Sequence, residues 1–230
     1  FQLFQIGFGG VPGRPIGDGP DGHSLWPSFT NVPNEFIEAY FPLRIEKYET
    51  ITDSGGPGLH RGGNGLSVAY RFLVDGHIGI HDDRWLTYPW GVNGGKPGNR
   101  STKLLVRSDG TEEFIPAKCE GVKVQKGDLL YFNTWGGGGW GNPLERDPAH
   151  VISDVAKKLV SIDGAKRYGV VINDDLSLDE KETKALRSKM SKDSVKDELF
   201  NFGGTIEEIK SRSLEETNIE PPVSPTFLNQ

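Results

Sequence analysis

The chain has 230 residues, and its 26 Lys and Arg against 32 Asp and Glu give a formal net charge of −6. This length fits one large domain or two small ones, and the lack of a basic block argues against nucleic acid as the main partner. No apolar stretch approaches the roughly eighteen residues of a membrane span, and the single cysteine, Cys119, favours a cytoplasmic setting. A small molecule or another protein is therefore the expected partner.

Glycine and tryptophan divide the chain into two regions. Of the 31 glycines, 27 lie at or before Gly141, as do all five tryptophans, whereas charged residues are enriched in the later part. We predict a mainly β body over residues 1–147 and a charged helical tail over residues 148–230, which is α+β overall. The last ten residues, PPVSPTFLNQ, predict an extended proline-rich arm that becomes ordered only on a partner.

Apolar residues alternate with polar ones through much of the body. The alternation predicts strands over 66–74 and 78–80, with Asp75-Gly76 as the hairpin turn that pairs them. Further short strands are predicted over 104–106, 114–115, 122–124 and 129–132, with turns at Asp109-Gly110 and Gly127-Asp128. Together these predict an antiparallel meander or a barrel-like body with glycine-rich loops.

Helix signals begin directly after the body. Asp147 followed by Pro148 predicts a helix start, and we expect that helix to pack on the sheet through Val151, Val155, Leu159 and Val160. The Ser/Thr-x-x-Glu capping pattern predicts three more helix starts, at Ser177 with Glu180, Thr205 with Glu208, and Ser213 with Glu216.

Common catalytic and cofactor motifs are weak or missing. His77 and His81 share a strand face and could bind a metal weakly, but an exposed edge strand explains them better. Cys119 has no neighbouring base, which favours a small buried side chain over a nucleophile. No G-x-x-x-x-G-K-[ST] motif occurs, and Pro12 interrupts a possible G-x-G-x-x-G motif, so a standard nucleotide fold is not predicted.

Clusters of polar residues and glycine are the strongest functional signal. They occupy residues 18–23, 30–38, 53–65 and 81–84, on loops, where a rigid sheet commonly carries its site. Taken singly, each of these residues is explained more simply as a turn or capping residue. We also predict that the backbone of the WGGGGW run over 135–140 packs closely against another segment or subunit.

Several longer strings carry a resemblance to a known family. They are TNVPNEFIE, YFPLRIEKYETITDSGGPGLHRGGNGL, DDRWLTYPWGVNGGKPG, GDLLYFNTWGGGGWGNPLERDP and RYGVV, in that order. Across roughly residues 1 to 173 the chain resembles the C-terminal third of the hydantoinase B and 5-oxoprolinase family, which also includes the large subunits of acetone and acetophenone carboxylases.

The resemblance implies part of a multi-subunit, ATP-dependent enzyme. Some family members open cyclic amides such as hydantoin or 5-oxoproline, and others carboxylate ketones, so a cyclic-amide hydrolase is expected, with a ketone carboxylase or a noncatalytic scaffold piece as alternatives. A hydantoinase A type subunit is the implied partner and carries ATP and Mg²⁺. A divalent metal (Zn, Mn or Fe) is implied on a more N-terminal segment outside this chain.

The family pattern selects six candidate site residues, which are Asn31, Asn34, Glu38, Asp53, His60 and Arg61. We expect the asparagine amides to orient a carbonyl, Arg61 to meet negative charge and a carboxylate to handle protons. We also expect all six to line one cleft. Because the chain starts at Phe1 within an apolar pattern and its only methionine is Met190, we expect a C-terminal piece of a longer polypeptide that is inactive alone and not a free monomer.

Overall fold

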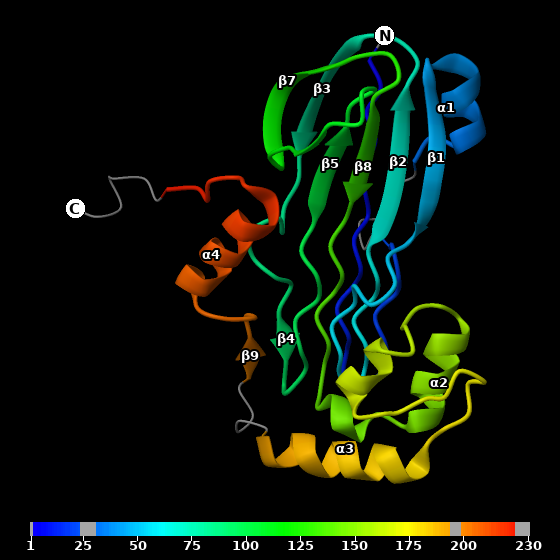
Figure 1. The fold of residues 1–230 in the computed structure, drawn as a ribbon, viewed down its shortest axis with the longest axis vertical. Coiled ribbons are helices and arrows are strands. Elements are labelled where there is room, and N and C mark those ends of the chain that lie inside the picture. Colours follow the sequence, from blue (N-terminus) through cyan, green and yellow to red (C-terminus); the bar gives the residue numbers. More distant parts are fainter. Residues whose placement is uncertain (1, 24–30, 194–198, 224–230) are drawn as a thin grey trace.

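The computed structural model describes residues 2–23, 31–193 and 199–223. Three parts follow one another along the longest axis of the molecule (Figure 1): an antiparallel β region, a central set of extended glycine-rich segments, and a helical unit. No helix within these described residues is long and apolar enough to cross a membrane. The predicted class, mainly β with C-terminal helices, is confirmed.

The β region consists of two antiparallel sheets that share one core. The larger sheet contains β1 (Leu43–Thr50), β2 (Leu66–Phe72), β8 (Leu129–Asn133), β5 (Thr102–Val106) and β6 (Glu112–Phe114), in that spatial order. The smaller sheet pairs β3 (Gly76–His81) with β7 (Lys118–Val124). Leu105 and Leu130 of the large sheet pack in one buried cluster with Ile80 and Val124 of the small sheet. The strands thus do not follow chain order, and among the described residues they form no closed barrel.

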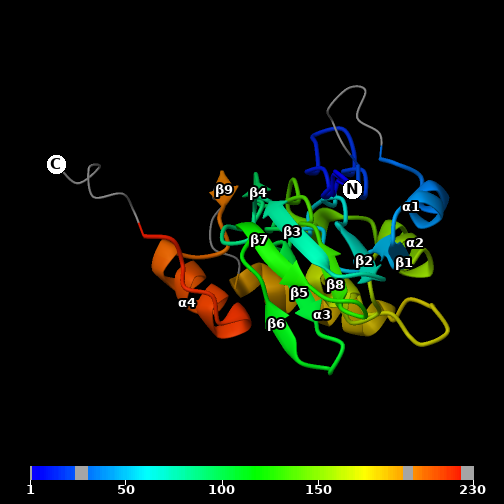
Figure 2. The ribbon, with the colours of Figure 1, turned by 90° about the horizontal axis from the view of Figure 1, so that it is seen from above.

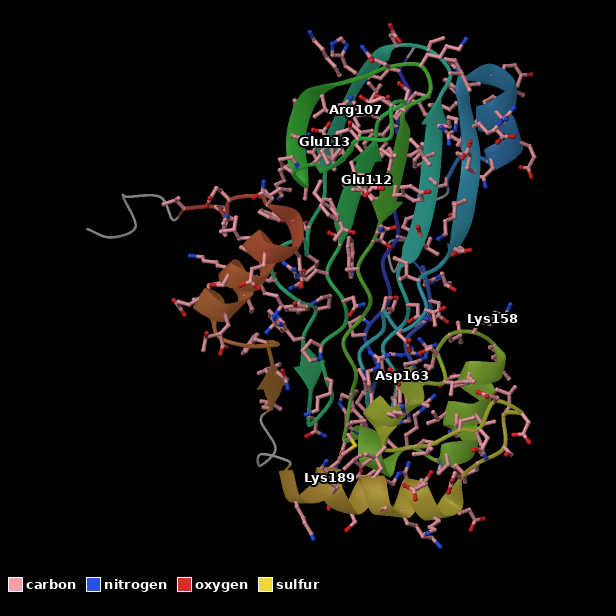
Figure 3. The ribbon with its side chains drawn as sticks, in the orientation of Figure 1. Arg107, Glu112, Glu113, Lys158, Asp163 and Lys189 are labelled. Carbon is pink, nitrogen blue, oxygen red and sulfur yellow. The ribbon has the colours of Figure 1, made fainter. Side chains whose placement is uncertain are left out.

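The predicted turns are present, but one predicted strand pair is wrong. Gly110, at φ +89°, closes the hairpin between β5 and β6, and Figure 3 shows Arg107 beside Glu113, its ion-pair partner, on that hairpin. The turn at Asp75-Gly76 instead carries the chain from one sheet to the other. Both edges of β2 are occupied by β1 and β8, so β3 has no free edge of β2 to pair with.

Helix α1 (Asn34–Tyr40) covers the end of the large sheet beside β1, with Ile37 buried in the core. Figures 1 and 2 place α4 (Ile206–Thr217) on the opposite side of the sheet from α1. The chain reaches α4 through the two-residue strand β9 (Phe200–Asn201), which pairs with β4 (Gly91–Val92). Most of the predicted proline-rich arm, residues 224–230, lies outside the described residues.

The helical unit has a hydrophobic core of its own. It contains η1 (Pro143–Glu145), α2 (Pro148–Ala156), η2 (Gly164–Tyr168) and α3 (Glu180–Asp193). Asp147 caps α2 as predicted, because its side chain accepts a hydrogen bond from the Ala149 N–H at 2.8 Å. The expectation that α2 packs on the sheet is wrong. Its apolar face instead forms a separate cluster with Val160, Ala165, Tyr168, Val170 and Ile172.

Only one of the three predicted capping boxes starts a helix. Thr205 and Glu208 form a complete capping box at α4. At α3 the cap is Asp179, whose side chain accepts a hydrogen bond from the Glu182 N–H at 2.9 Å, so the prediction of Ser177 is wrong. Ser213 is wrong as well, because it lies within α4 and is fully buried.

Extended glycine-rich segments join the β region to the helical unit (Figure 1). We call them the glycine layer; it comprises residues 9–13, 54–65, 90–99 and 134–141. Successive residues bond to different segments: the Gly137 N–H donates to Gly63 O, the Gly139 N–H donates to Lys96 O, and Gly138 O accepts from the Gly13 N–H. A β-ladder would instead pair one segment with a single neighbour on each side.

The glycines of this layer leave no room for side chains. A Cβ atom added at Gly136, Gly138 or Gly139 would lie less than 3.0 Å from a backbone oxygen of another segment. Glycine is therefore required here by the close approach of backbones, as expected for the WGGGGW run.

Candidate functional site

The six candidate residues fall into two groups held by different parts of the fold. Asn31, Asn34 and Glu38 lie on or next to α1, beside β1. Asp53, His60 and Arg61 lie in or next to the glycine layer, and Asp53 and Arg61 contact the helical unit. The described residues show no hydrogen bond or ion pair that joins the two groups, and none of the six side chains lines the pocket beside β5 and β8 that is described below.

The α1 group holds neighbouring backbone segments in place. The Asn31 side chain donates to Ile6 O at 2.8 Å and accepts from the Ile6 N–H at 3.2 Å, so it acts as a partner for the N-terminal segment. Asn34 is the first residue of α1. Glu38 accepts a hydrogen bond from the Ile45 N–H at 2.8 Å and thereby ties α1 to β1.

Asp53 connects the glycine layer to the helical unit. Its backbone is left-handed, with φ +66°. Its carboxylate accepts hydrogen bonds from the Ser161 N–H and from Arg167 Nη2, each at 3.0 Å. These bonds fix the turn after α2 against the layer; Lys158 and Asp163 lie in the same part of the helical unit (Figure 3).

Arg61 belongs to a buried network of charges where the glycine layer meets the helical unit. Its side chain is only 4% exposed, and its guanidinium donates to both carboxylate oxygens of Asp21, at 2.8 and 3.2 Å. Burial alone would lower the pKa of this guanidinium, but the hydrogen bond and charge of Asp21 raise it overall. Arg61 therefore stays charged inside the fold, where it is shielded from solvent.

Arg146 is the second cation of the network. Its two terminal nitrogens donate to the two oxygens of Asp18 at 2.7 Å, and Nη2 also donates to Asp154 at 2.8 Å. Asp18 additionally accepts from the Arg61 N–H at 2.7 Å, so it links both arginines. Tyr168 lies against the network, fully buried, and burial raises the pKa of its phenol to about 12.

His60 lies at the accessible edge of this network. Its backbone exchanges two hydrogen bonds with Trp140, both at 2.9 Å, which fixes its position in the glycine layer. Its Nδ1 is 3.9 Å from Asp18 Oδ1, and 26% of its side chain is exposed. His60 thus combines a partly exposed imidazole with a nearby carboxylate, an arrangement that suits a side chain with a role in proton transfer.

We expect the network to weaken in acid. Burial would raise the pKa of Asp18, but the hydrogen bond and charge of Arg146 and the Arg61 N–H lower it below the usual value of 3.8. A carboxyl with a lowered folded-state pKa stabilises the fold above its unfolded-state pKa and loses that contribution as the pH falls through the folded-state value.

Urea unfolding at pH 7 and at pH 3 measures this dependence, with Asp18→Asn as the comparison. We expect the wild-type midpoint to fall more between the two pH values than the Asp18→Asn midpoint. Equal falls would show that Asp18 does not contribute to the acid sensitivity.

The residues considered above as possible metal ligands or as a nucleophile are not part of this network. His77 and His81 are both exposed on β3, and His81 pairs with Glu120 of β7. Cys119 is half-buried beside the core of the two sheets, and burial raises the pKa of its thiol. Within the part of the chain that the structure describes, no three His, Cys, Asp or Glu side chains are grouped so that they could hold a metal ion.

Sequence reasoning overlooked the partners that complete the network. Asp18 and Asp21 lie in a predicted polar cluster, but Arg146 comes from the end of the predicted body and Asp154 from the start of the predicted tail. The available signal was two acidic residues among glycines, Asp18 and Asp21, and an arginine, Arg146, far along the chain. Such a pattern does not specify which charged residues pair with each other.

A family model described as hydantoinase B/oxoprolinase matches residues 1–143. The chain belongs to the hydantoinase B/oxoprolinase family. The match includes the glycine layer and both groups of candidate residues, so the features described above lie largely inside the family region.

Two relatives show how much of a longer protein this chain represents. It is 35% identical over 189 residues to a Pseudomonas sp. (strain NS671) protein described as the candidate B component of a D-/L-hydantoinase, covering 81% of this chain and 31% of the relative. It is 37% identical over 161 residues to the beta chain of caprolactamase from Pseudomonas jessenii, covering 67% of this chain and 27% of the relative. The chain thus spans less than a third of each relative.

Two solved structures resemble this fold. The ATP-dependent caprolactamase from Pseudomonas jessenii matches with a TM-score of 0.63 at 30% identity, over 78% of this chain and 32% of that one. A nucleotide-free acetone carboxylase matches with a TM-score of 0.63 at 20% identity, over 90% of this chain and 32% of that one. The carboxylase likeness is evidence for the fold alone.

Proposed function

We propose that this chain is the C-terminal part of a hydantoinase B type subunit in an ATP-dependent hydrolase that opens cyclic amides. The observation that carries the proposal is the 37% identity to the beta chain of caprolactamase, supported by a structural match to ATP-dependent caprolactamase at 30% identity. A ketone carboxylase, the alternative implied by the family resemblance, is the second candidate, because the match to acetone carboxylase has only 20% identity and supports the fold alone. A noncatalytic scaffold role is the third.

The proposed reaction needs ATP because an amide carbonyl is a poor electrophile. Transfer of a phosphoryl group from ATP to the carbonyl oxygen releases ADP and converts that oxygen into a leaving group. Water then adds to the carbon and the ring C–N bond breaks, which leaves an acyl phosphate and the released nitrogen as N–H. A second water hydrolyses the acyl phosphate to a carboxylate and phosphate. One cyclic amide, one ATP and two waters thus give the ring-opened acid, ADP and phosphate.

We place ATP and Mg²⁺ on a hydantoinase A type partner and a divalent metal on a segment outside this chain. The two relatives are each named as one component of a larger enzyme, which supports an assembly of several subunits. The described residues of this chain do not fit a metal centre, since no suitable group of His, Cys, Asp or Glu is present among them. We therefore assign no catalytic step of this chain to a metal. The cytoplasmic setting stays a prediction.

The chain itself would supply a rigid platform with His60 at its accessible edge. We propose that His60, whose Nδ1 lies 3.9 Å from Asp18 Oδ1, acts in proton transfer at the face of the glycine layer. Asp53 and Arg61 would position that face through their contacts to the helical unit, and the residues around α1 would position the N-terminal segment. The catalytic roles expected of Asn31, Asn34, Glu38, Asp53 and Arg61 stay predictions.

ADP release by the purified complex tests the proposal. We expect turnover that depends on hydantoin, 5-oxoproline or caprolactam, and none that depends on acetone with bicarbonate. Turnover only with acetone and bicarbonate would establish the carboxylase instead. The same assay on a complex carrying His60→Gln addresses the scaffold role: we expect turnover to fall about 100-fold while the mass of the complex is unchanged, and unchanged turnover would favour a scaffold.

A further inference from the structure

A pocket of about 320 Å³ lies where β5 and β8 meet the glycine layer, and none of its lining residues belongs to the Arg61 and Arg146 network. It is lined by residues from five separate parts of the chain. Those that matter here are Ser54, Tyr88, Asn99, Arg100, Asn133 and Glu216. The volume suits a small molecule, and most of these groups are polar.

Arg100 supplies a buried positive charge to this pocket. Its side chain is 4% exposed, and its guanidinium lies over the Tyr88 ring at 5.1 Å from the ring centroid. Nη1 donates to Trp85 O at 3.1 Å, and Nη2 is paired with the Glu216 carboxylate. A guanidinium removed from water this completely requires an anion beside it.

The anion that Arg100 has in this structure comes from the edge of the fold. Glu216 is 50% exposed and lies in the last turn of α4. Among the side chains of α4 only Ile209 and Ser213 are buried. The Ser213 hydroxyl is buried without a hydrogen-bond partner among the described residues, so docking of α4 leaves a polar group unsatisfied. Arg212 adds one tie, since its Nη1 donates to the Tyr88 hydroxyl at 3.1 Å. The half-exposed Glu216 carboxylate is the group of α4 that an incoming anion would have to displace.

Asn133 adds an unused acceptor to the same pocket. Its Nδ2 donates to Thr102 Oγ1 at 3.2 Å. Its Oδ1 is buried and has no hydrogen-bond partner in the described part of the chain. An acceptor in this state favours a molecule that brings an N–H or O–H donor. The lining of the pocket therefore contains a paired cation, Arg100, and an unsatisfied acceptor, Asn133.

We propose that this pocket binds a small carboxylate that also carries an N–H or O–H donor, and that Glu216 occupies the anion position in its absence. The planar guanidinium of Arg100 pairs with the carboxylate of the ligand, and Asn133 Oδ1 accepts from its donor. Glu216 is then an internal competitor, tethered through α4. This inference does not rest on the proposed hydrolase activity.

Calorimetric titration of the full chain with N-acetylglycine tests the inference, because this probe has one carboxylate and one amide N–H. We expect Glu216→Gln to bind the probe about tenfold more tightly than wild type, the factor expected if Glu216 occupies the site about nine-tenths of the time. The matched control is Glu215→Gln, an exposed neighbour on α4 with the same charge change, which should bind like wild type.

Further titrations identify which groups of the ligand the pocket recognises. N-methylacetamide, which lacks the carboxylate, should not bind, and Arg100→Lys added to Glu216→Gln should lose the gain. Equal affinity of Glu216→Gln and Glu215→Gln for N-acetylglycine would overturn the proposal, as would equal tightening for inorganic phosphate. Circular dichroism checks each variant, and if the Arg100 variant does not fold, the comparison of the two glutamate variants still decides.

Discussion

Replacing Gly138 by alanine should destabilise the fold by about 3 kcal/mol or more, at the upper end of the cost of overpacking. The added Cβ would lie less than 3.0 Å from the Trp90 carbonyl oxygen, and the atoms around it belong to backbone rather than to side chains that could turn away. Relief would require the 90–99 segment to separate from the 134–141 segment, with loss of the hydrogen bonds between them. Urea unfolding followed by circular dichroism measures the loss.

Gly17→Ala is the matched control for this substitution. A Cβ atom at Gly17 has no atom within 4 Å, so the same chemical change meets open space. We expect its unfolding free energy to lie within about 0.5 kcal/mol of wild type. Similar stability of Gly138→Ala and Gly17→Ala would mean that the glycine layer tolerates side chains, contrary to its observed spacing.

Replacing Arg146 by methionine should cost about 3–5 kcal/mol, the range for removing one partner of a buried ion pair. The side chain is 3% exposed and bonds to both Asp18 and Asp154, so its removal leaves two carboxylates without this counter-ion. Asp154 is itself 8% exposed, so the loss of Arg146 removes a hydrogen-bond partner from a poorly solvated carboxylate. The free energy of unfolding in urea at pH 7 checks this expectation.

Lys166→Met serves as the control for Arg146→Met because it removes the same charge from a surface pair. Lys166 bonds to Asp163 at 2.8 Å, and both side chains are largely exposed. Pairs of this kind contribute about 0–1 kcal/mol. A loss for Arg146→Met no larger than that for Lys166→Met would show that the buried network adds little to stability.

Local features of the fold were predictable, and long-range partners were not. Strands such as β5 and β8, the Asp109-Gly110 turn and the Asp147 cap each depend on a few neighbouring residues, and all are present. The predicted pairing of β2 with β3 failed because the choice of strand partner depends on which edges the rest of the sheet leaves free. Alternation of residues contains no information on that choice.

The candidate site shows the same division. The sequence marks Arg61 as charged and next to glycines, but its burial depends on Asp21 and on contacts with Asp154 from the helical unit. Capping patterns also recur by chance inside helices, as at Ser213, where the local pattern is complete but the helix has already begun. The pocket at Arg100 could not be predicted, since its lining comes from segments as far apart as Ser54 and Glu216.

The glycine layer also bears on how the chain reaches its folded state. Its contacts join residues far apart along the chain, as in the hydrogen bond that the Gly10 N–H donates to Trp135 O at 2.8 Å. Closing such long loops costs chain entropy. Glycine has no side chain to bury, so the glycines of the layer offset little of this cost. We therefore expect the hairpins of the β region to form early and the layer to close late. Until it closes, the chain exposes unpaired backbone N–H and C=O groups on several segments at once.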